Sequence, residues 1–308
     1  MPAYNVNYIT MIKRETLKTE QQNKNSVSID RLSIGEVLMT INDEDQKVSD
    51  AVKKALPEIE KVVNYAKSAL VSGGRVFYIG AGTSGRLGVL DASECPPTYS
   101  VPTDWFIGII AGGDKALRQS IEGAEDQSDS SIEDLKKYKI TDKDLVIGIS
   151  CSGAAKYVIS SLDYARNKGC KTAYLITNPI PFLQTDVDAM IIVDTGPEVI
   201  TGSTRMKAGT ATKMVLNMIS TATMVSMGKV YGNLMVDLMA VNKKLVDRGT
   251  RIIQQVTGLD YDSSQNALMN ANKSVKTAIV MIKKNCDLDE ATEKINAADG
   301  LLNRLIDS

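Results

Sequence analysis

Three segments of the sequence combine glycine with hydroxyl side chains, and each follows an apolar run. They span residues 80–88, 148–153 and 202–211. Glycine lets the backbone approach an anion closely, and the first turn of a helix presents unpaired N–H groups that bind phosphate. Turns that follow the strands of an open α/β sheet lie at the same edge of that sheet. We therefore predict that the three segments form one anion site, the alternative being that serine and glycine merely cap helices there.

The first segment contains the GxGxxG pattern that is also found in dinucleotide-binding proteins. A dinucleotide site needs an acidic residue about 20 positions further on, at the end of the next strand. Glu94 comes too early for that role, and Asp114 comes about 30 positions on. The hydroxyls of Thr83 and Ser84 inside the turn suit a compact phosphate monoester better than a pyrophosphate. The segment therefore favours a small phosphorylated molecule over a nucleotide.

The sequence contains no histidine, which limits the acid–base chemistry available to the protein. A Ser-His or Cys-His nucleophile and a histidine-ligated metal are excluded, so proton transfer depends on carboxylates, Lys, Tyr or Cys. Glu94 lies where Pro96 and Pro97 are expected to end a helix, and Glu125 lies in the acidic cluster 122–126. Two carboxylates can act as acid and base when their surroundings push their pKa values apart. The alternative for either glutamate is ordinary surface charge.

Composition and charge exclude several other classes of protein. The chain has 308 residues, with 36 Lys and Arg against 37 Asp and Glu, so the formal net charge is −1 and gives no sign of nucleic-acid binding. Its four cysteines form no CxxC pair, which indicates a reducing compartment without a zinc site or redox dithiol. The longest apolar run, residues 214–227, is interrupted by polar side chains and is too short for a membrane span. Because no signal peptide is recognisable either, we predict a cytoplasmic protein that binds neither nucleic acid nor membrane.

Short apolar runs alternate with helical patterns through the middle of the chain. The runs are residues 76–79, 107–111, 145–150, 172–177 and 190–193. Continuously apolar strands separated by helices are typical of a parallel sheet that is covered on both faces. The sequence therefore predicts an α/β fold with a doubly wound, mostly parallel sheet.

The flanking regions contain helical patterns only. Residues 1–28 are expected to form an extended or partly ordered arm without site residues, and residues 34–70 two helices, the second beginning near Val48. After the sheet, helices are expected over 214–227, 234–256, 265–270, 275–283 and 290–298. The apolar stretch 208–227 fits a helix that is buried either in the core or against a second subunit. This pattern predicts three parts: an arm with the first helix over 1–45, an α/β domain over 46–256 and a small all-helical module over 257–308.

The motifs are specific enough to identify a family. The sequence resembles the N-acetylmuramic acid 6-phosphate etherases, members of the sugar isomerase (SIS) superfamily, over nearly the whole chain. The resemblance lies in residues 80–88, 90–97, 110–113, 122–126, 196–199, 201–205, 207–211 and 228–237, in residues 41–45, and in Thr19, Glu20, Asn23, Ser26, Ile29 and Asp30. It implies an SIS-type α/β domain that binds a sugar phosphate, followed by a UBA-like three-helix module. It also implies a cytoplasmic homodimer, without metal or cofactor, that acts in the recycling of cell-wall sugars.

The implied reaction removes D-lactate from N-acetylmuramic acid 6-phosphate and leaves N-acetylglucosamine 6-phosphate. By motif correspondence, Glu94 resembles the proton donor of the family and Glu125 its second catalytic carboxylate. In the ring-opened sugar the C2 hydrogen lies next to the C1 aldehyde, so its removal gives an enolate that can expel the C3 ether oxygen. We therefore assign Glu125 to the C2 proton and Glu94 to the departing lactyl oxygen, after which water adds at C3. A non-catalytic sugar-phosphate sensor and an aldose–ketose isomerase on the same scaffold are the alternatives.

The predicted substrate contacts come mainly from the three segments. The phosphate is expected among the hydroxyls of Thr83, Ser84, Ser152, Ser203 and Thr204. Three cations are expected near the phosphate or the lactyl carboxylate, Arg86, Arg205 and Lys207, although the last two fit a solvent-facing position equally well. Gly82, Gly153 and Glu198 complete the predicted binding set. The second segment departs from the family, whose members commonly have Arg-Thr-Pro or Lys-Thr-Pro where this chain has Ala154, Ala155 and Lys156, and we expect weakened phosphate binding rather than its loss.

Overall fold

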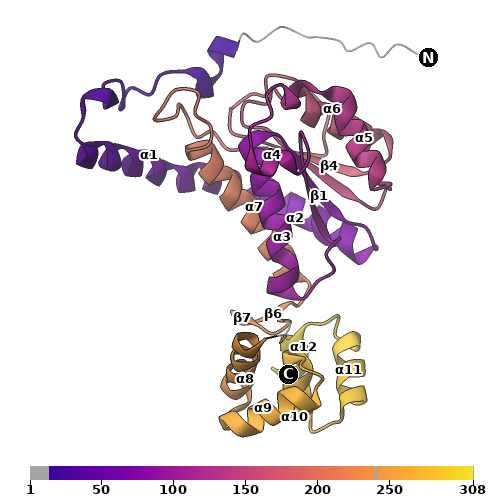
Figure 1. The fold of residues 1–308 in the computed structure, drawn as a ribbon. Coiled ribbons are helices and arrows are strands. Elements are labelled where there is room, and N and C mark those ends of the chain that lie inside the picture. Colours follow the sequence, from indigo (N-terminus) through magenta and orange to yellow (C-terminus); the bar gives the residue numbers. More distant parts are fainter. Residues whose placement is uncertain (1–13, 239, 241, 308) are drawn as a thin grey trace.

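The computed structural model describes residues 14–238, 240 and 242–307, and Figure 1 shows that they form two parts. The larger part is a sheet with helices on both faces, and the smaller is a group of helices at the C-terminal end. This arrangement confirms the predicted α/β class and helical tail. Within the described residues, no helix is long and apolar enough to cross a membrane, and no group of three His, Cys, Asp or Glu side chains could hold a metal ion.

Five parallel strands form the main sheet in the order β2-β1-β3-β4-β5. They are β1 (Val76–Gly80), β2 (Phe106–Ile110), β3 (Leu145–Ile149), β4 (Lys171–Ile176) and β5 (Ala189–Ile192). The register places Gly80, the last residue of β1, beside Ile110 and Ile149, so three strands end at one level. Because β2 lies on one side of β1 and β3 on the other, the strand order reverses at β1. Open α/β sheets bind their ligands at such a reversal.

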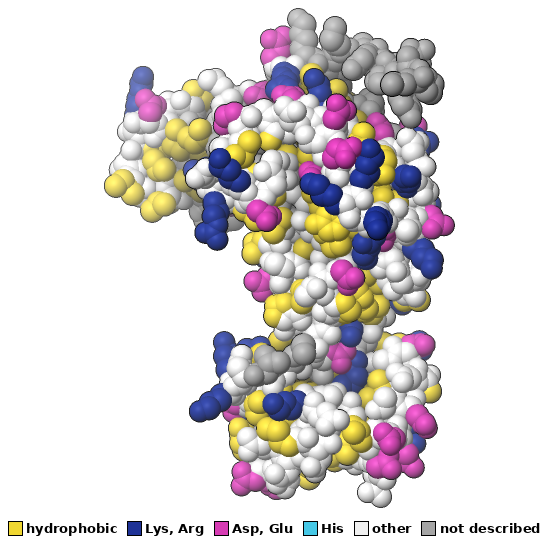
Figure 2. Space-filling view, turned by 45° about the vertical axis from the view of Figure 1, so that its right-hand side comes forward, with side chains coloured by type: hydrophobic (Ala, Val, Ile, Leu, Met, Phe, Trp, Pro, Cys, Tyr) yellow, Lys and Arg dark blue, Asp and Glu magenta, His cyan; other side chains and the backbone are white. Residues whose placement is uncertain are grey.

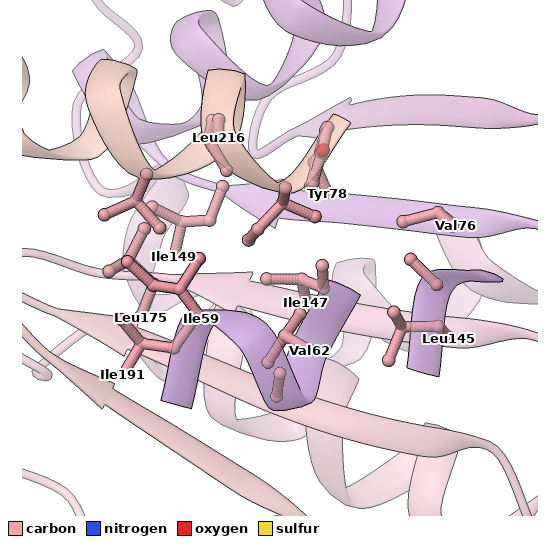
Figure 3. Close-up of a cluster of buried hydrophobic side chains, with 14 of the residues drawn as sticks. Ile59, Val62, Val76, Tyr78, Leu145, Ile147, Ile149, Leu175, Ile191 and Leu216 are labelled. Carbon is pink, nitrogen blue, oxygen red and sulfur yellow. The ribbon is translucent and has the colours of Figure 1, made fainter. Parts of the chain in front are cut away.

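Alternate residues of each strand pack into separate cores on the two faces of the sheet. In β1, Val76 and Tyr78 belong to one cluster, whereas Phe77 and Ile79 belong to the other. Figure 3 shows part of the first cluster, where side chains of two helices lie against the strands. That face is covered by α1 (Ile34–Lys54), α2 (Leu56–Val71), α3 (Gly82–Tyr99) and α7 (Lys207–Ser226). The opposite face is covered by α5 (Ser128–Lys137) and α6 (Lys156–Asn167).

Two helices precede the sheet as predicted, but the second begins at Leu56 rather than near Val48. α1 starts with a capping box in which Ser33 Oγ accepts the N–H of Glu36 and the Glu36 carboxylate accepts the N–H of Ser33. The helix then continues through Val48, which is buried. The break comes just before Pro57, which lies in the first turn of α2. Proline fits that turn and not a helix interior, so Pro57 was the signal for the boundary.

The tail begins with a hairpin, where the sequence predicted a helix over 234–256. The strands β6 (Val230–Tyr231) and β7 (Leu234–Met235) pair in antiparallel fashion around the Gly-Asn dipeptide 232–233, which is a typical two-residue hairpin turn. The first helix of the tail starts only after Asn242, whose side chain accepts the N–H of Leu245. The prediction is therefore wrong for residues 234–238, 240 and 242, which the structure describes as non-helical, whereas residues 239 and 241 lie outside the described residues. The tail helices are α8 (Lys243–Thr257), α9 (Tyr261–Asn270), α10 (Val275–Lys284), α11 (Leu288–Ala297) and α12 (Leu302–Ile306).

A third apolar cluster holds the tail together, and it reaches beyond the predicted module of residues 257–308. Val236 and Leu238 belong to it, as do Ile252 and Ile253 of α8, and they pack with the four following helices. We therefore propose that the helical module begins near residue 230. The other predicted boundary, between residues 45 and 46, falls inside α1.

α7 packs against α1, α2 and α3 and is buried along much of its length. Val215, Leu216 and Ile219 lie in the first apolar cluster, which agrees with the prediction of a core helix. A different side of α7 remains open, because Met214 and Met218 line a groove between α7 and α2. The burial of this helix within one chain is therefore incomplete.

Candidate active site

The three glycine- and hydroxyl-rich turns meet at the carboxyl edge of the sheet. Ser84 Oγ lies 3.6 Å from Cys151 Sγ, so the first and second turns are in contact. The Cys151 thiol also interacts with the hydroxyls of Thr177 and Thr204, and Thr204 belongs to the third turn. Burial raises the pKa of this thiol, and its interactions with the three hydroxyls offset burial only in part. The result is a cluster of neutral hydrogen-bonding groups around one point of the strand edge.

The first turn brings the N-terminus of α3 to this cluster. Gly82 opens the helix with a φ of +54°, which glycine adopts without strain. Among the described residues no side chain caps this end, so the first N–H groups of α3 remain for an anion beside Thr83 and the buried Ser84. A Cβ on Gly85 would lie 2.6 Å from the carbonyl oxygen of Gly80. The GxGxxG pattern thus permits a close contact between strand and helix.

The second turn follows β3 and depends on Gly153. This residue has a φ of +71°, and a Cβ there would lie 2.7 Å from Pro181 Cα, so other residues are disfavoured. The carbonyls of Ser152 and Gly153 accept backbone N–H groups from residues 182 and 183 at 3.2 and 2.9 Å. Lys156 is exposed at the first residue of α6. A cation at a helix N-terminus opposes the helix dipole, and it strengthens the positive potential at this edge of the sheet.

The third turn packs directly against the first. The N–H of Ser203 donates to the carbonyl of Ile200 at 2.9 Å, and both Ser203 and Thr204 are half-buried. A Cβ on Gly209, in the first turn of α7, would lie 3.5 Å from Thr83 Cγ2. Arg205 is exposed. The hydroxyls of all three turns therefore belong to one small region.

Two residues of the predicted binding set, Glu198 and Lys207, are buried and fully engaged inside the protein. The Glu198 carboxylate accepts the N–H groups of Lys207 and Ala208 at 2.9 Å each and so caps α7. Burial raises the pKa of this carboxyl, although the two N–H groups lower it. Lys207 Nζ donates to Glu44 Oε2 at 2.7 Å. These contacts give both residues a structural role, that of fixing the start of α7 directly after the third turn. Contact with substrate stays a prediction for them.

Arg86 forms hydrogen bonds with the segment that precedes Glu125. Its Nε and Nη2 donate to the carbonyls of Leu117 and Gln119 at 3.2 Å each. These carbonyls lie at the end of α4 (Lys115–Arg118), where a cation is favourable. Arg86 therefore links the N-terminal part of α3 to the chain that continues toward Glu125, and its contact with substrate stays a prediction.

Glu94 lies inside α3 and not at the end of a helix, as the two prolines led us to predict. The helix runs on to Tyr99 with Pro96 and Pro97 inside it. The prolines remove two N–H donors, yet the N–H of Ser100 still donates to the carbonyl of Pro96 at 2.9 Å. The helix ends only at Ser100, where φ is +53°. The prediction that the helix ends at Glu94 is therefore wrong.

Glu94 lies on α3, the helix that begins at the first turn. Glu94 is exposed, and helical periodicity places it on the same face as Thr83 and the exposed Leu90. At the usual rise per residue, Glu94 lies about 15 Å along the axis from Ser84. This face of α3, formed by the half-buried Thr83 and Arg86 and the exposed Leu90 and Glu94, thus runs from the turns to this carboxylate.

Glu125 lies in the short 3-10 helix η4 (Ala124–Asp126), which packs against α6. The preceding Gly123 has a φ of +71°. Glu125 is exposed, as Glu94 is, and no hydrogen bond links these two carboxylates. The structure therefore brings the hydroxyl turns together but leaves both glutamates open to solvent in one chain.

Sequence reasoning missed three buried polar residues that support the turns. Glu44 pairs with Lys207, Asn178 Nδ2 donates to the carbonyl of Cys151 at 3.2 Å, and Thr19 contacts Asn178. Thr19 and residues 41–45 belong to the motifs of the family resemblance, which was the only signal in the sequence. Their partners lie far away along the chain, so local patterns could not reveal these contacts.

The fold and the turns define a class of protein, and two family models match the residues that form them. Residues 127–222 match the family described as SIS domain, and residues 54–166 match the family described as glucokinase regulatory protein N-terminal SIS domain. A solved structure of a phosphoheptose isomerase from Neisseria gonorrhoeae is similar, with 15% identity and a TM-score of 0.48 over 62% of this chain and 98% of that chain. The α/β part of this protein is an SIS domain.

Relatives that are similar over almost the whole chain show which family it belongs to. An N-acetylmuramic acid 6-phosphate etherase from Bacillus cytotoxicus is 50% identical over 95% of this chain and 99% of the relative. Etherases of the same name from Oceanobacillus iheyensis and Escherichia coli are 49% and 45% identical over 94% and 95% of this chain. The chain belongs to the N-acetylmuramic acid 6-phosphate etherase family, which confirms the resemblance inferred from its motifs.

Proposed function

We propose that this protein is a carbon–oxygen lyase that cleaves the D-lactyl ether of N-acetylmuramic acid 6-phosphate. The products are N-acetylglucosamine 6-phosphate and D-lactate. The observation that carries this proposal is the similarity to etherases over almost the full chain, which reaches 50% identity over 292 residues. The cluster of Ser84, Cys151 and Thr204 beside an uncapped helix N-terminus supports it, because such a cluster suits a phosphate monoester.

The reaction proceeds by elimination followed by addition of water. In the ring-opened sugar, a base removes the proton from C2, and the electron pair of that bond forms an enolate with the C1 aldehyde. The enolate then expels the C3 ether oxygen, which takes a proton from an acid and leaves as D-lactate. Water adds to C3 of the unsaturated aldehyde, and C2 regains a proton. One base and one acid therefore suffice, without a redox step.

The substrate lies along the exposed face of α3 in this proposal. Its phosphate binds the hydroxyls of the three turns and the first N–H groups of α3. The sugar extends from there along the face of α3 on which Glu94 lies. Arg86 and Lys156 add positive charge near the phosphate end. Gly82 keeps this end free of a side chain, and Gly153 lets the second turn pack closely against Pro181.

Glu94 acts as the acid on the lactyl oxygen, and Glu125 acts as the base at C2. Glu94 ends the proposed substrate path along α3, and Arg86 ties the chain before Glu125 to the same helix. Both carboxylates are exposed in a single chain. Acid–base catalysis benefits from a drier surrounding that separates the two pKa values, so a covering surface is needed when substrate is bound.

A second copy of the chain supplies this cover. A groove of about 870 Å³ between α2 and α7 is lined by apolar side chains, among them Leu56, Ile59, Val63, Met214, Met218 and Val225. The N-terminal half of α1 leaves Ile34, Leu38 and Met39 exposed by 81%, 62% and 60%. Figure 2 shows hydrophobic side chains gathered on the part of the molecule that α1 forms, at the upper left. The chain thus has two exposed apolar surfaces, the groove and the N-terminal half of α1. Such surfaces fit a homodimer in which the apolar surfaces of one chain pack against those of the other.

We keep the cytoplasm as the proposed compartment. All four cysteines are free thiols, and two of them, Cys95 and Cys170, are buried. Burial raises the pKa of each of these two thiols to about 12, so they stay protonated and unreactive. Free thiols agree with a reducing environment, where disulfides are rare.

One experiment tests the proposed function. The purified protein is incubated with N-acetylmuramic acid 6-phosphate, and D-lactate and the sugar product are measured together. Equal amounts of D-lactate and N-acetylglucosamine 6-phosphate are expected. A ketose phosphate without lactate would indicate an isomerase, and binding without any product would indicate a sugar-phosphate sensor. Either outcome would overturn the proposal.

A further inference from the structure

The N-terminal arm, residues 14–31, is ordered and lies on the carboxyl edge of the sheet. We expected no site residues in this region, but three of its polar side chains are buried: Thr19, Asn23 and Ser26 are exposed by 0%, 7% and 6%. Figure 1 shows the arm, in indigo, beside the loop that precedes α7. Asn23 Nδ2 donates to the carbonyl of Pro197 at 3.1 Å, and Ser26 Oγ donates to that of Val199 at 2.7 Å.

Thr19 is the residue of the arm that reaches two of the phosphate turns. Its carbonyl accepts the N–H of Gly202 at 3.1 Å, directly before Ser203 and Thr204 of the third turn. Its hydroxyl accepts from Asn178 Nδ2 at 3.1 Å, and its N–H donates to Asn178 Oδ1 at 3.3 Å. Thr19 and Asn178 are both fully buried, so these bonds do not compete with water.

Asn178 extends this connection to the second turn. Its Nδ2 group donates to the carbonyl of Cys151 at 3.2 Å, next to Ser152. The same carbonyl accepts the N–H and the hydroxyl of Thr177 at 3.0 and 3.2 Å. The backbone of the second turn is thus held at the Cys151 carbonyl as well as at Ser152 and Gly153, and Thr19 orients the amide that donates to Cys151.

We propose that Thr19 is a positioning residue that fixes the second and third turns relative to each other, and so builds the phosphate site before substrate arrives. This inference rests on the proposed function of the turns. Thr19 does not contact the substrate; it acts through Asn178 on Ser152 and through Gly202 on Ser203 and Thr204. A preformed set of hydroxyls binds phosphate without first ordering the loops, so the effect of Thr19 appears in substrate affinity.

The test compares Thr19→Val with two matched variants in steady-state kinetics on N-acetylmuramic acid 6-phosphate. Thr19→Val keeps the side-chain shape but removes the acceptor for Asn178, and we expect KM to rise about 5- to 10-fold with kcat within about 2-fold of wild type. Thr19→Ser keeps the hydroxyl and is expected to retain the wild-type KM. Ser26→Ala removes another buried hydroxyl of the arm and is expected to lower the unfolding midpoint without changing KM.

Two outcomes would overturn the inference. One is a wild-type KM for Thr19→Val, and the other is an equal rise in KM for Ser26→Ala, which would show a general loosening of the arm. Where Thr19→Val does not fold, Asn178→Asp serves in its place, because it turns the donor toward Cys151 into an acceptor, and KM is again expected to rise. D-lactate release by the wild-type protein is measured in parallel, so failure of the proposed function is recognised separately.

Discussion

Lys207 Nζ lies 2.7 Å from Glu44 Oε2, and the two side chains are only 2% and 3% exposed. This ion pair connects α1 to the first residue of α7. The backbone N–H of Lys207 is bound by Glu198 at the same time, so the start of α7 is held from two sides. The third glycine- and hydroxyl-rich turn precedes this point directly, and the pair therefore stabilises the wall of the proposed site.

Replacing Lys207 by Met is expected to destabilise the protein by about 3 kcal/mol, because it leaves the Glu44 charge buried without its partner. Lys47 is the matched control, since it also pairs with Glu44 but is 55% exposed. Lys47→Met is expected to cost less than about 1 kcal/mol. Urea denaturation of both variants measures the difference, and equal losses would contradict the role of burial.

Glu44 also predicts how stability depends on pH. Burial raises the pKa of this carboxyl, but hydrogen bonds from Lys207, Lys47 and Asn25 bring it from 4.5 down to about 2. Because the folded-state pKa lies below the unfolded one, the ionised carboxylate contributes stability above pH 4.5, and this contribution is lost as the pH falls toward about 2. The shift corresponds to about 3 kcal/mol.

Urea denaturation of wild type and Glu44→Gln at several pH values between 6 and 2 tests this expectation. The difference in unfolding free energy between the two proteins should shrink as the pH falls. A difference that stays constant over the whole range would show that Glu44 does not titrate as we describe.

The fold was largely readable from the sequence where the signal was local. The five apolar runs became the five strands, because a strand buried on both faces needs a continuous apolar run. The errors occurred where two local signals competed. Apolar periodicity predicted a helix from residue 234, although the Gly-Asn turn of the β6–β7 hairpin comes directly before it. The two prolines of α3 predicted a helix end near Glu94, but α3 packs closely against β2 and continues to Tyr99.

The site was readable only in part, for a different physical reason. The hydroxyl turns follow strands, so the fold class alone predicted that they converge. The roles of Glu198 and Lys207 depend on a helix cap and on an ion pair with Glu44, far away in the sequence. Likewise, the partner of Thr19 is Asn178. No periodicity or spacing encodes such contacts.

Ser84→Ala is expected to weaken phosphate binding without disturbing the chemistry. Ser84 is buried at the meeting point of the first two turns, and a lost hydrogen bond to a charged group costs about 1.5–3 kcal/mol. KM should therefore rise by at least about 10-fold with kcat nearly unchanged. Ser68→Ala, an exposed serine on α2, is the control. An unchanged KM for Ser84→Ala would remove this hydroxyl from the site.

Met218→Glu is expected to separate the proposed dimer, because it places a charge in the apolar groove between α2 and α7. Light scattering after size-exclusion chromatography should give a monomer, with activity reduced at least about 10-fold because the glutamates lose their cover. Met269→Glu carries the same change at an exposed methionine of α9, whereas Met218 is half-buried, and it should remain dimeric and active. A wild-type protein that is monomeric and active would contradict the proposed interface.

The most direct test of the proposed mechanism is the rate of D-lactate release by Glu94→Gln. We expect turnover to fall about 100- to 10,000-fold, since glutamine cannot protonate the departing oxygen. Binding of N-acetylglucosamine 6-phosphate should stay near wild type, and Glu122→Gln, a change at a neighbour of Glu125, should release D-lactate normally. D-lactate release by Glu94→Gln at the wild-type rate would contradict the assignment of Glu94 as the acid.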